Sequence, residues 1–222
     1  MKTLILRHDS KLSHQYAEVT AKSCDDLDIE WEYHDGYSKM SPDAAWIDID
    51  IIPVELKQKW DNSNQQKASL CTASHVKMWK KIAESEEDTV ILEHDALMLH
   101  KFDLKLPDMK FVALGYKLQK PEIYDHKGAG PTKHIIDSHS HKGTHAYAIT
   151  GKTAKYLIEE IKTNGSGLGC VDTHYFGQKK TKVKMSIADP ISAIGWLRES
   201  TIWGSSSNMN STYIESFRKN LL

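Results

Sequence analysis

The residues best suited to chemistry lie in the segment ILEHDA, where two carboxylates, Glu93 and Asp95, flank His94. Residues 89–92 are β-branched or apolar, which predicts a buried strand that ends at Glu93. Ligands of open α/β sheets gather beyond the carboxyl ends of the strands, so an acid-x-acid pair there is well placed to hold a divalent cation. Such a cation can bridge the two phosphates of a nucleotide donor and stabilise the departing diphosphate as a Lewis acid. Taken alone, the tripeptide is weak evidence for a metal site and favours a polar strand-exit turn and helix cap.

A strong helical pattern precedes this strand, in the segment KASLCTASHVKMWKKIAES at positions 67–85. Its side chains at steps of three and four define one face, made by Cys71, His75, Met78, Trp79 and Ile82. On spacing alone, His75 is a core histidine that hydrogen-bonds to the backbone.

The remaining segments alternate between strand and helix patterns. Strands are predicted at 3–6, 29–33, 111–114, 145–149 and 183–188, and helices at 12–23 and 152–161. Residues 38–66 are expected to form a long loop with short helical pieces. This alternation predicts one α/β domain over 1–222, with a mixed, mostly parallel sheet flanked by helices and a mobile polar tail from about residue 203.

Composition excludes several classes of protein. The chain has 222 residues, of which 40% are apolar and 27% charged, and its formal net charge of −1 provides no field that would attract nucleic acid. Its longest apolar stretches of four or five residues are far below the roughly 20 that a membrane span needs. The N-terminus lacks the apolar region of a secretory signal, so we expect a cytoplasmic protein.

The three cysteines, Cys24, Cys71 and Cys170, are odd in number and widely spaced. This predicts reduced, partly buried thiols rather than a disulfide framework or a metal knuckle.

A histidine-rich tract, HIIDSHSHKGTH, offers a different chemistry. It contains His134, Asp137, His139, His141 and His145. His139 and His141 form an H-x-H pair of the kind that a metal hydrolase would use, whereas the surrounding Ser, Lys and Gly residues favour a solvated loop.

The run from Cys71 to Ala96 resembles the core of glycosyltransferase family 25, which includes bacterial lipooligosaccharide and animal procollagen galactosyltransferases. The family's cysteine, Ser-His pair, Trp, Ile and Leu-Glu-Asp-Asp metal motif are matched in order by Cys71, Ser74, His75, Trp79, Ile82 and Leu92 to Asp95. The resemblance continues along most of the chain, at His34 to Gly36, Gly143 to Glu159, Val171 to Gly177, Pro190 and Ser200 to Ile202.

This resemblance implies a GT-A-like fold and an inverting transferase, related to lipopolysaccharide biosynthesis, that moves galactose or glucose from a UDP-sugar to a glycan hydroxyl. It assigns Glu93 and Asp95 to Mn²⁺ or Mg²⁺ and to the donor diphosphate. It places the Ser74-His75 pair and the turn at Gly36 beside the donor.

The resemblance also suggests a base and exposes a departure from the family. Asp172 would take the proton of the acceptor hydroxyl from the face opposite the leaving group, or would instead orient the acceptor or cap a helix. His94 stands where the family has Asp, so it either points away or adds an imidazole ligand, which would favour Mn over Mg. This departure keeps open the alternative of an inactive relative that binds nucleotide-sugar or glycan.

Overall fold

The computed structural model describes residues 1–51, 63–115, 130–137, 143–164, 171, 181–195, 199–200 and 204–205. Its first half contains β1 (Lys2–His8), α1 (Lys11–Asp25), β2 (Trp31–Gly36), α2 (Pro42–Asp48), α3 (Ser63–Ser85), β3 (Thr89–Glu93), β4 (Ala96–Met98) and β5 (Lys110–Ala113). The second half contains β6 (His134–Asp137), β7 (Ala146–Ile149), α4 (Gly151–Asn164), β8 (Lys184–Asp189), β9 (Ala193–Gly195), β10 (Glu199–Ser200) and β11 (Gly204–Ser205).

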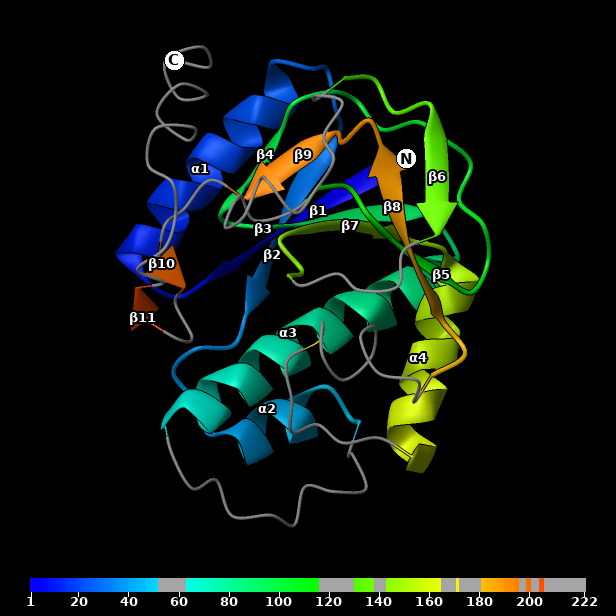
Figure 1. Cartoon of the computed structure of the whole chain (residues 1–222). Helices are drawn as coiled ribbons and strands as arrows, with labels where there is room; N and C mark the ends of the chain where they lie inside the picture. The colour runs from blue at the N-terminus through cyan, green and yellow to red at the C-terminus, as the bar shows by residue number, and fades with distance from the viewer. Residues whose placement is uncertain are drawn as a thin grey trace.

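The centre of the molecule is a seven-stranded sheet in the order β2-β1-β3-β7-β5-β8-β6 (Figure 1). β1 lies parallel to β2 and β3, and β5 lies parallel to β8. β7 is antiparallel to both β3 and β5, and β6 is antiparallel to β8. Five of the seven strands therefore share one direction, which confirms the predicted mixed, mostly parallel sheet. A smaller sheet pairs β4 with β9.

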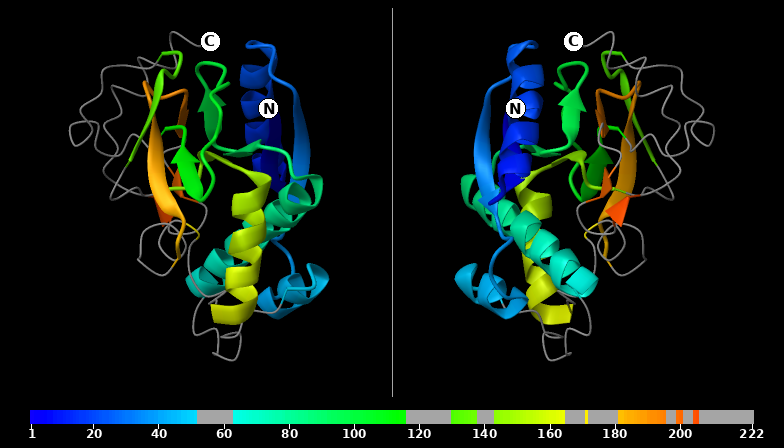
Figure 2. Two further views of the ribbon diagram at one scale, coloured as in Figure 1. Left: turned by 90° about the vertical axis from the view of Figure 1, so that its right-hand side faces the viewer. Right: turned by 90° about the vertical axis from the view of Figure 1, so that its left-hand side faces the viewer.

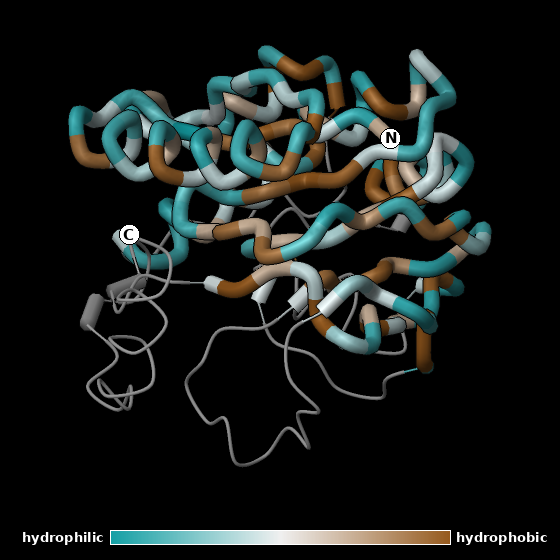
Figure 3. The backbone as a smooth tube through the Cα atoms, turned by 90° about the horizontal axis from the view of Figure 1, so that it is seen from above, coloured by the Kyte–Doolittle hydropathy of each residue, from teal (hydrophilic) through white to brown (hydrophobic). Residues whose placement is uncertain are grey.

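Helices cover both faces of the sheet. α2, α3 and α4 gather on one side of the molecule, and α1 lies on the other (Figure 2). Alternate side chains of β1 enter the two cores: Leu4 and Leu6 pack into the cluster beneath α3 and α4, whereas Ile5 packs into the cluster beneath α1. The trace coloured by hydropathy shows hydrophobic stretches at the centre and helices of mixed character around them (Figure 3).

The predicted helix over 67–85 is present as the long helix α3, which begins slightly earlier, at Ser63. Ile91 of β3 packs on the α3 side, so Glu93, two residues further on, is directed to the same side. The histidine tract differs from the expected loop, because His134 to Asp137 form the strand β6 at one edge of the sheet.

No helix in the described part of the chain is long and apolar enough to cross a membrane. The tail predicted from about residue 203 lies outside the described residues, apart from Gly204 and Ser205 in β11. The extent of the domain over 1–222 stays a prediction.

Candidate functional site

Three parallel strands end side by side at one edge of the sheet. The register places Leu6 of β1 opposite both His34 of β2 and Glu93 of β3, and His8 opposite Gly36. The carboxyl ends of β1, β2 and β3 therefore meet where ligands of α/β sheets bind (Figure 1).

A chain of hydrogen bonds runs through the protein interior to the Glu93 carboxylate. Trp79 Nε1 donates to the Tyr147 hydroxyl at 2.9 Å, and this hydroxyl lies 2.9 Å from His75 Nδ1. His75 Nε2 lies 3.1 Å from Glu93 Oε1. Because an indole N–H only donates, the Tyr147 hydroxyl is an acceptor there and can donate its own proton to Nδ1. His75 then carries its proton on Nε2 and donates it to Glu93.

The components of this chain are buried to different degrees. The side chains of His75 and Tyr147 are fully buried, whereas the Glu93 side chain is 16% exposed. Burial raises the pKa of the Tyr147 hydroxyl well above its ordinary range, so it stays protonated as a donor. Thr144 adds a second donor to Glu93 Oε1. The Glu93 carboxylate is thus held by hydrogen bonds from His75 and Thr144, and it remains partly exposed to solvent.

Ser74 and Gly36 are brought together at the end of β2. Ser74 Oγ donates to Leu70 O at 2.7 Å and accepts from the Tyr37 N–H at 2.8 Å. A Cβ atom at Gly36 would lie 2.7 Å from Ser74 Oγ and 2.8 Å from Leu6 Cδ1. The Asp-Gly turn is therefore explained by close contact between β2 and α3, with Ser74 as the link.

His94 packs toward α1. Its ring is stacked on Tyr16 at 6.1 Å and meets His8 edge-on at 5.1 Å, and the residue is 7% exposed. Burial, followed by the nearby His94, lowers the pKa of His8 to about 4. The His94 ring thus contacts a different set of side chains from Glu93.

One group of possible metal ligands is present among the described residues. Cys71, His75 and Glu93 offer ligand atoms that all lie within 4.8 Å of one another. Asp95 is 5% exposed in the turn between β3 and β4 and does not belong to this group. Joint ligation by Glu93 and Asp95 stays a prediction.

Three members of this site were not identified from the sequence: Cys71, Thr144 and Tyr147. Cys71 lies one helical turn before His75, which was predicted, so the i,i+4 spacing was an available signal. Thr144 and Tyr147 lie in the Gly-Thr-x-x-Tyr segment, but their contacts with Glu93 and His75 join positions 51 and 72 residues apart.

Several predicted residues cannot be placed. Asp172, His139 and His141 lie outside the described residues, although Val171 is buried. In β6, Asp137 pairs with Lys110 and accepts from Ser186 Oγ at 3.2 Å. These contacts assign Asp137 a structural role in the edge strand β6. The metal-hydrolase alternative stays a prediction.

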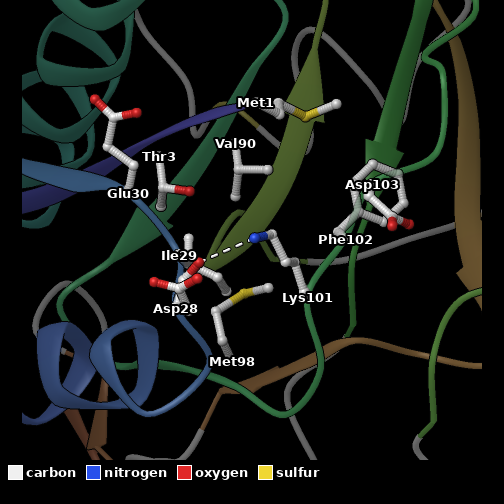
Figure 4. Close-up of a pocket in the computed structure, with 10 residues that line it drawn as sticks. All are labelled: Met1, Thr3, Asp28, Ile29, Glu30, Val90, Met98, Lys101, Phe102 and Asp103. Atoms are coloured by element: carbon white, nitrogen blue, oxygen red, sulfur yellow. Dashed lines mark hydrogen bonds between the residues drawn. The ribbon is translucent and has the colours of Figure 1, made fainter.

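A cavity of about 190 Å³ lies away from these residues (Figure 4). Its lining includes Thr3 and Val90, near the amino ends of β1 and β3, and Lys101, whose Nζ donates to Asp28 O at 2.9 Å. It is therefore at the opposite ends of these strands from His8 and Glu93.

Comparison with known proteins adds the following. The family model described as glycosyltransferase family 25 (LPS biosynthesis protein) matches residues 11–172. The galactosyltransferase LgtC in complex with donor and acceptor sugar analogues has a similar structure, with a TM-score of 0.50, 15% identity and coverage of 100% of this chain and 95% of that chain. At this identity the likeness shows the fold alone, a GT-A fold as predicted.

Two further solved structures have lower scores. An active-site mutant of LgtC has a TM-score of 0.44 at 12% identity, covering 99% of this chain and 96% of that one. A glycosyltransferase involved in glycosylation of the major capsid of PBCV-1 has a TM-score of 0.35 at 11% identity, covering 73% and 68%. No curated protein matches the chain significantly.

Proposed function

The chain belongs to glycosyltransferase family 25, and on this premise we propose that it transfers galactose or glucose from a UDP-sugar to a hydroxyl of a glycan, with inversion. The observation that carries the proposal is the Glu93 carboxylate at the carboxyl edge of the sheet, held by His75 and Thr144. Such a fixed, partly exposed carboxylate suits a donor site, because its orientation is set before the ligand arrives.

We assign the divalent cation that this chemistry uses to the residues at the end of β3. Glu93 and Asp95 offer hard oxygen atoms one residue apart, and Mg²⁺ and Mn²⁺ prefer such ligands. When bound, the cation would supply positive charge against the diphosphate of the donor.

The residues of the chain would divide the remaining work. His75, oriented by Tyr147, holds the Glu93 carboxylate in place, and Ser74 holds the end of β2 beside α3. The acceptor oxygen would bond to the anomeric carbon as the bond from that carbon to UDP breaks. Asp172 is the proposed base that takes the acceptor proton, and UDP leaves with the bonding electrons.

The test is UDP release from a panel of UDP-sugars in the presence of Mn²⁺ and an acceptor glycan. We expect release by the wild type and its loss in Asp95→Asn. Asp26→Asn is the matched control, because Asp26 is exposed at the end of α1 and pairs with Lys22. Wild-type protein that binds UDP-sugar without releasing UDP would refute the transferase proposal and favour an inactive relative. Activity that survives Asp95→Asn and is lost in His139→Ala would favour the hydrolase alternative.

A further inference from the structure

Where α3 meets the end of β3, the thiol of Cys71 lies close to two side chains of the proposed donor site. Cys71, His75 and Glu93 bring together a thiol, an imidazole and a carboxylate, whose ligand atoms all lie within 4.8 Å of one another. We propose that these three side chains form a zinc-binding site.

The geometry is close to that of a bound ion. With Zn–S of about 2.3 Å and Zn–N and Zn–O of about 2.0–2.2 Å, the ligand atoms of a tetrahedral site lie roughly 3.3–3.6 Å apart. His75 Nε2 and Glu93 Oε1 are already 3.1 Å apart, and Cys71 lies one helical turn before His75 on the same face. Small side-chain rotations of Cys71 and Glu93 would therefore complete the set. Three protein ligands leave a fourth position, which the partial exposure of Glu93 opens to solvent.

The ligand chemistry selects zinc over the cations of the donor site. A thiolate is a soft ligand that favours Zn²⁺, whereas Mg²⁺ and Mn²⁺ favour oxygen. Cys71 is partly exposed, as an ion's entry requires. Cys24, by contrast, is fully buried on the inner face of α1, where burial raises the pKa of its thiol to about 12. The two cysteines therefore offer a matched comparison.

Zinc binding would reverse the hydrogen bond between His75 and Tyr147. Zinc on Nε2 requires the His75 proton to be on Nδ1, where it donates to the Tyr147 hydroxyl 2.9 Å away. An N–H donated to a neighbouring oxygen is the usual support of a zinc-bound histidine. The Cys71 thiol loses its proton to solvent, so one proton is released for each ion bound.

A consequence follows for the donor site, and it rests on the function proposed above. A Glu93 oxygen that ligates zinc is withdrawn from the donor and its cation. We therefore expect zinc to inhibit the Mn²⁺-dependent reaction.

The site is tested with protein that has been stripped of metal and titrated with Co²⁺ as a spectroscopic substitute for zinc. Wild type and Cys24→Ala should develop a thiolate-to-cobalt charge-transfer band that zinc abolishes, and Cys71→Ala should show none. The zinc Kd, measured by competition, should rise at least about 100-fold in Cys71→Ala, because loss of a ligand costs no less than loss of its supporting contact. Far-UV circular dichroism checks that each variant is folded.

A wild type without the band, or a band that persists in Cys71→Ala, would overturn the zinc site. Glu93→Gln gives a second test, because the amide keeps the side-chain shape and should still weaken zinc binding. In the UDP-release assay, one equivalent of Zn²⁺ should inhibit wild type and Cys24→Ala but not Cys71→Ala. If the wild type releases no UDP at all, the transferase proposal fails while the cobalt result still decides the zinc site.

Discussion

Replacing Tyr147 with Phe removes the hydroxyl at the middle of the buried chain that ends at Glu93. This hydroxyl accepts from Trp79 Nε1 and contacts His75 Nδ1, both at 2.9 Å, and the whole side chain is buried. The phenyl ring can keep its stacking on Phe111, whose centroid is 4.4 Å away. Tyr147→Phe therefore isolates the loss of two hydrogen bonds from any loss of packing.

The expected loss of stability follows from the number of hydrogen bonds removed and from their burial. Each buried hydrogen bond contributes a net 0.5–1.5 kcal/mol, so the free energy of unfolding should fall by about 1–3 kcal/mol. His75 would also lose the contact that fixes its tautomer. We therefore expect Mn²⁺-dependent UDP release to fall about tenfold, as for the loss of a supporting hydrogen bond at a functional site.

Urea unfolding of wild type and variant measures the first effect, and UDP release measures the second. Tyr156→Phe is the matched control, because the Tyr156 hydroxyl also makes two contacts, with Glu160 and with the Lys182 N–H, each at 3.2 Å near the surface of α4. Its unfolding free energy should change by less than about 0.5 kcal/mol, since water replaces both partners. Equal unfolding midpoints for Tyr147→Phe and wild type, with unchanged m-values, would refute the buried hydrogen-bond chain.

Two further predictions concern the end of β2. Gly36→Ala should lower the free energy of unfolding by about 1–3 kcal/mol, because its Cβ would lie 2.7 Å from Ser74 Oγ. Gly130→Ala, whose Cβ would lie 3.6 Å from Pro190 Cγ, should melt close to wild type, and equal melting of both variants would contradict the reasoning. Burial, followed by Lys77, lowers the pKa of His34 to about 4 from an ordinary value of 6.5. The unfolded chain therefore binds the proton more readily, and the stability that this residue contributes above pH 6.5 is lost as the pH falls toward 4. His34→Gln should flatten the loss of stability over this range in urea titrations, whereas an unchanged slope would show that His34 titrates normally.

Local patterns predicted the elements that carry the site, but not their arrangement. The buried strand before Glu93 and the helix with His75 on its apolar face are present as β3 and α3. The insertion of β7 between β3 and β5 could not be predicted, because antiparallel pairing with strands more than 50 and more than 30 residues away leaves no periodic signal. The position of β7 in the sheet brings Tyr147 next to His75. The hydrogen-bond chain from Trp79 to Glu93 therefore depends on the order of the strands in the sheet.

His94, which stands where the family has Asp, packs on the α1 side of the end of β3. Its ring contacts Tyr16 and His8, and its peptide oxygen accepts from Thr20 Oγ1 at 2.9 Å. The contacts that fix Glu93 come instead from His75 and Thr144. A ring stacked against α1 leaves these contacts unchanged. The replacement is thus compatible with a donor site built on Glu93.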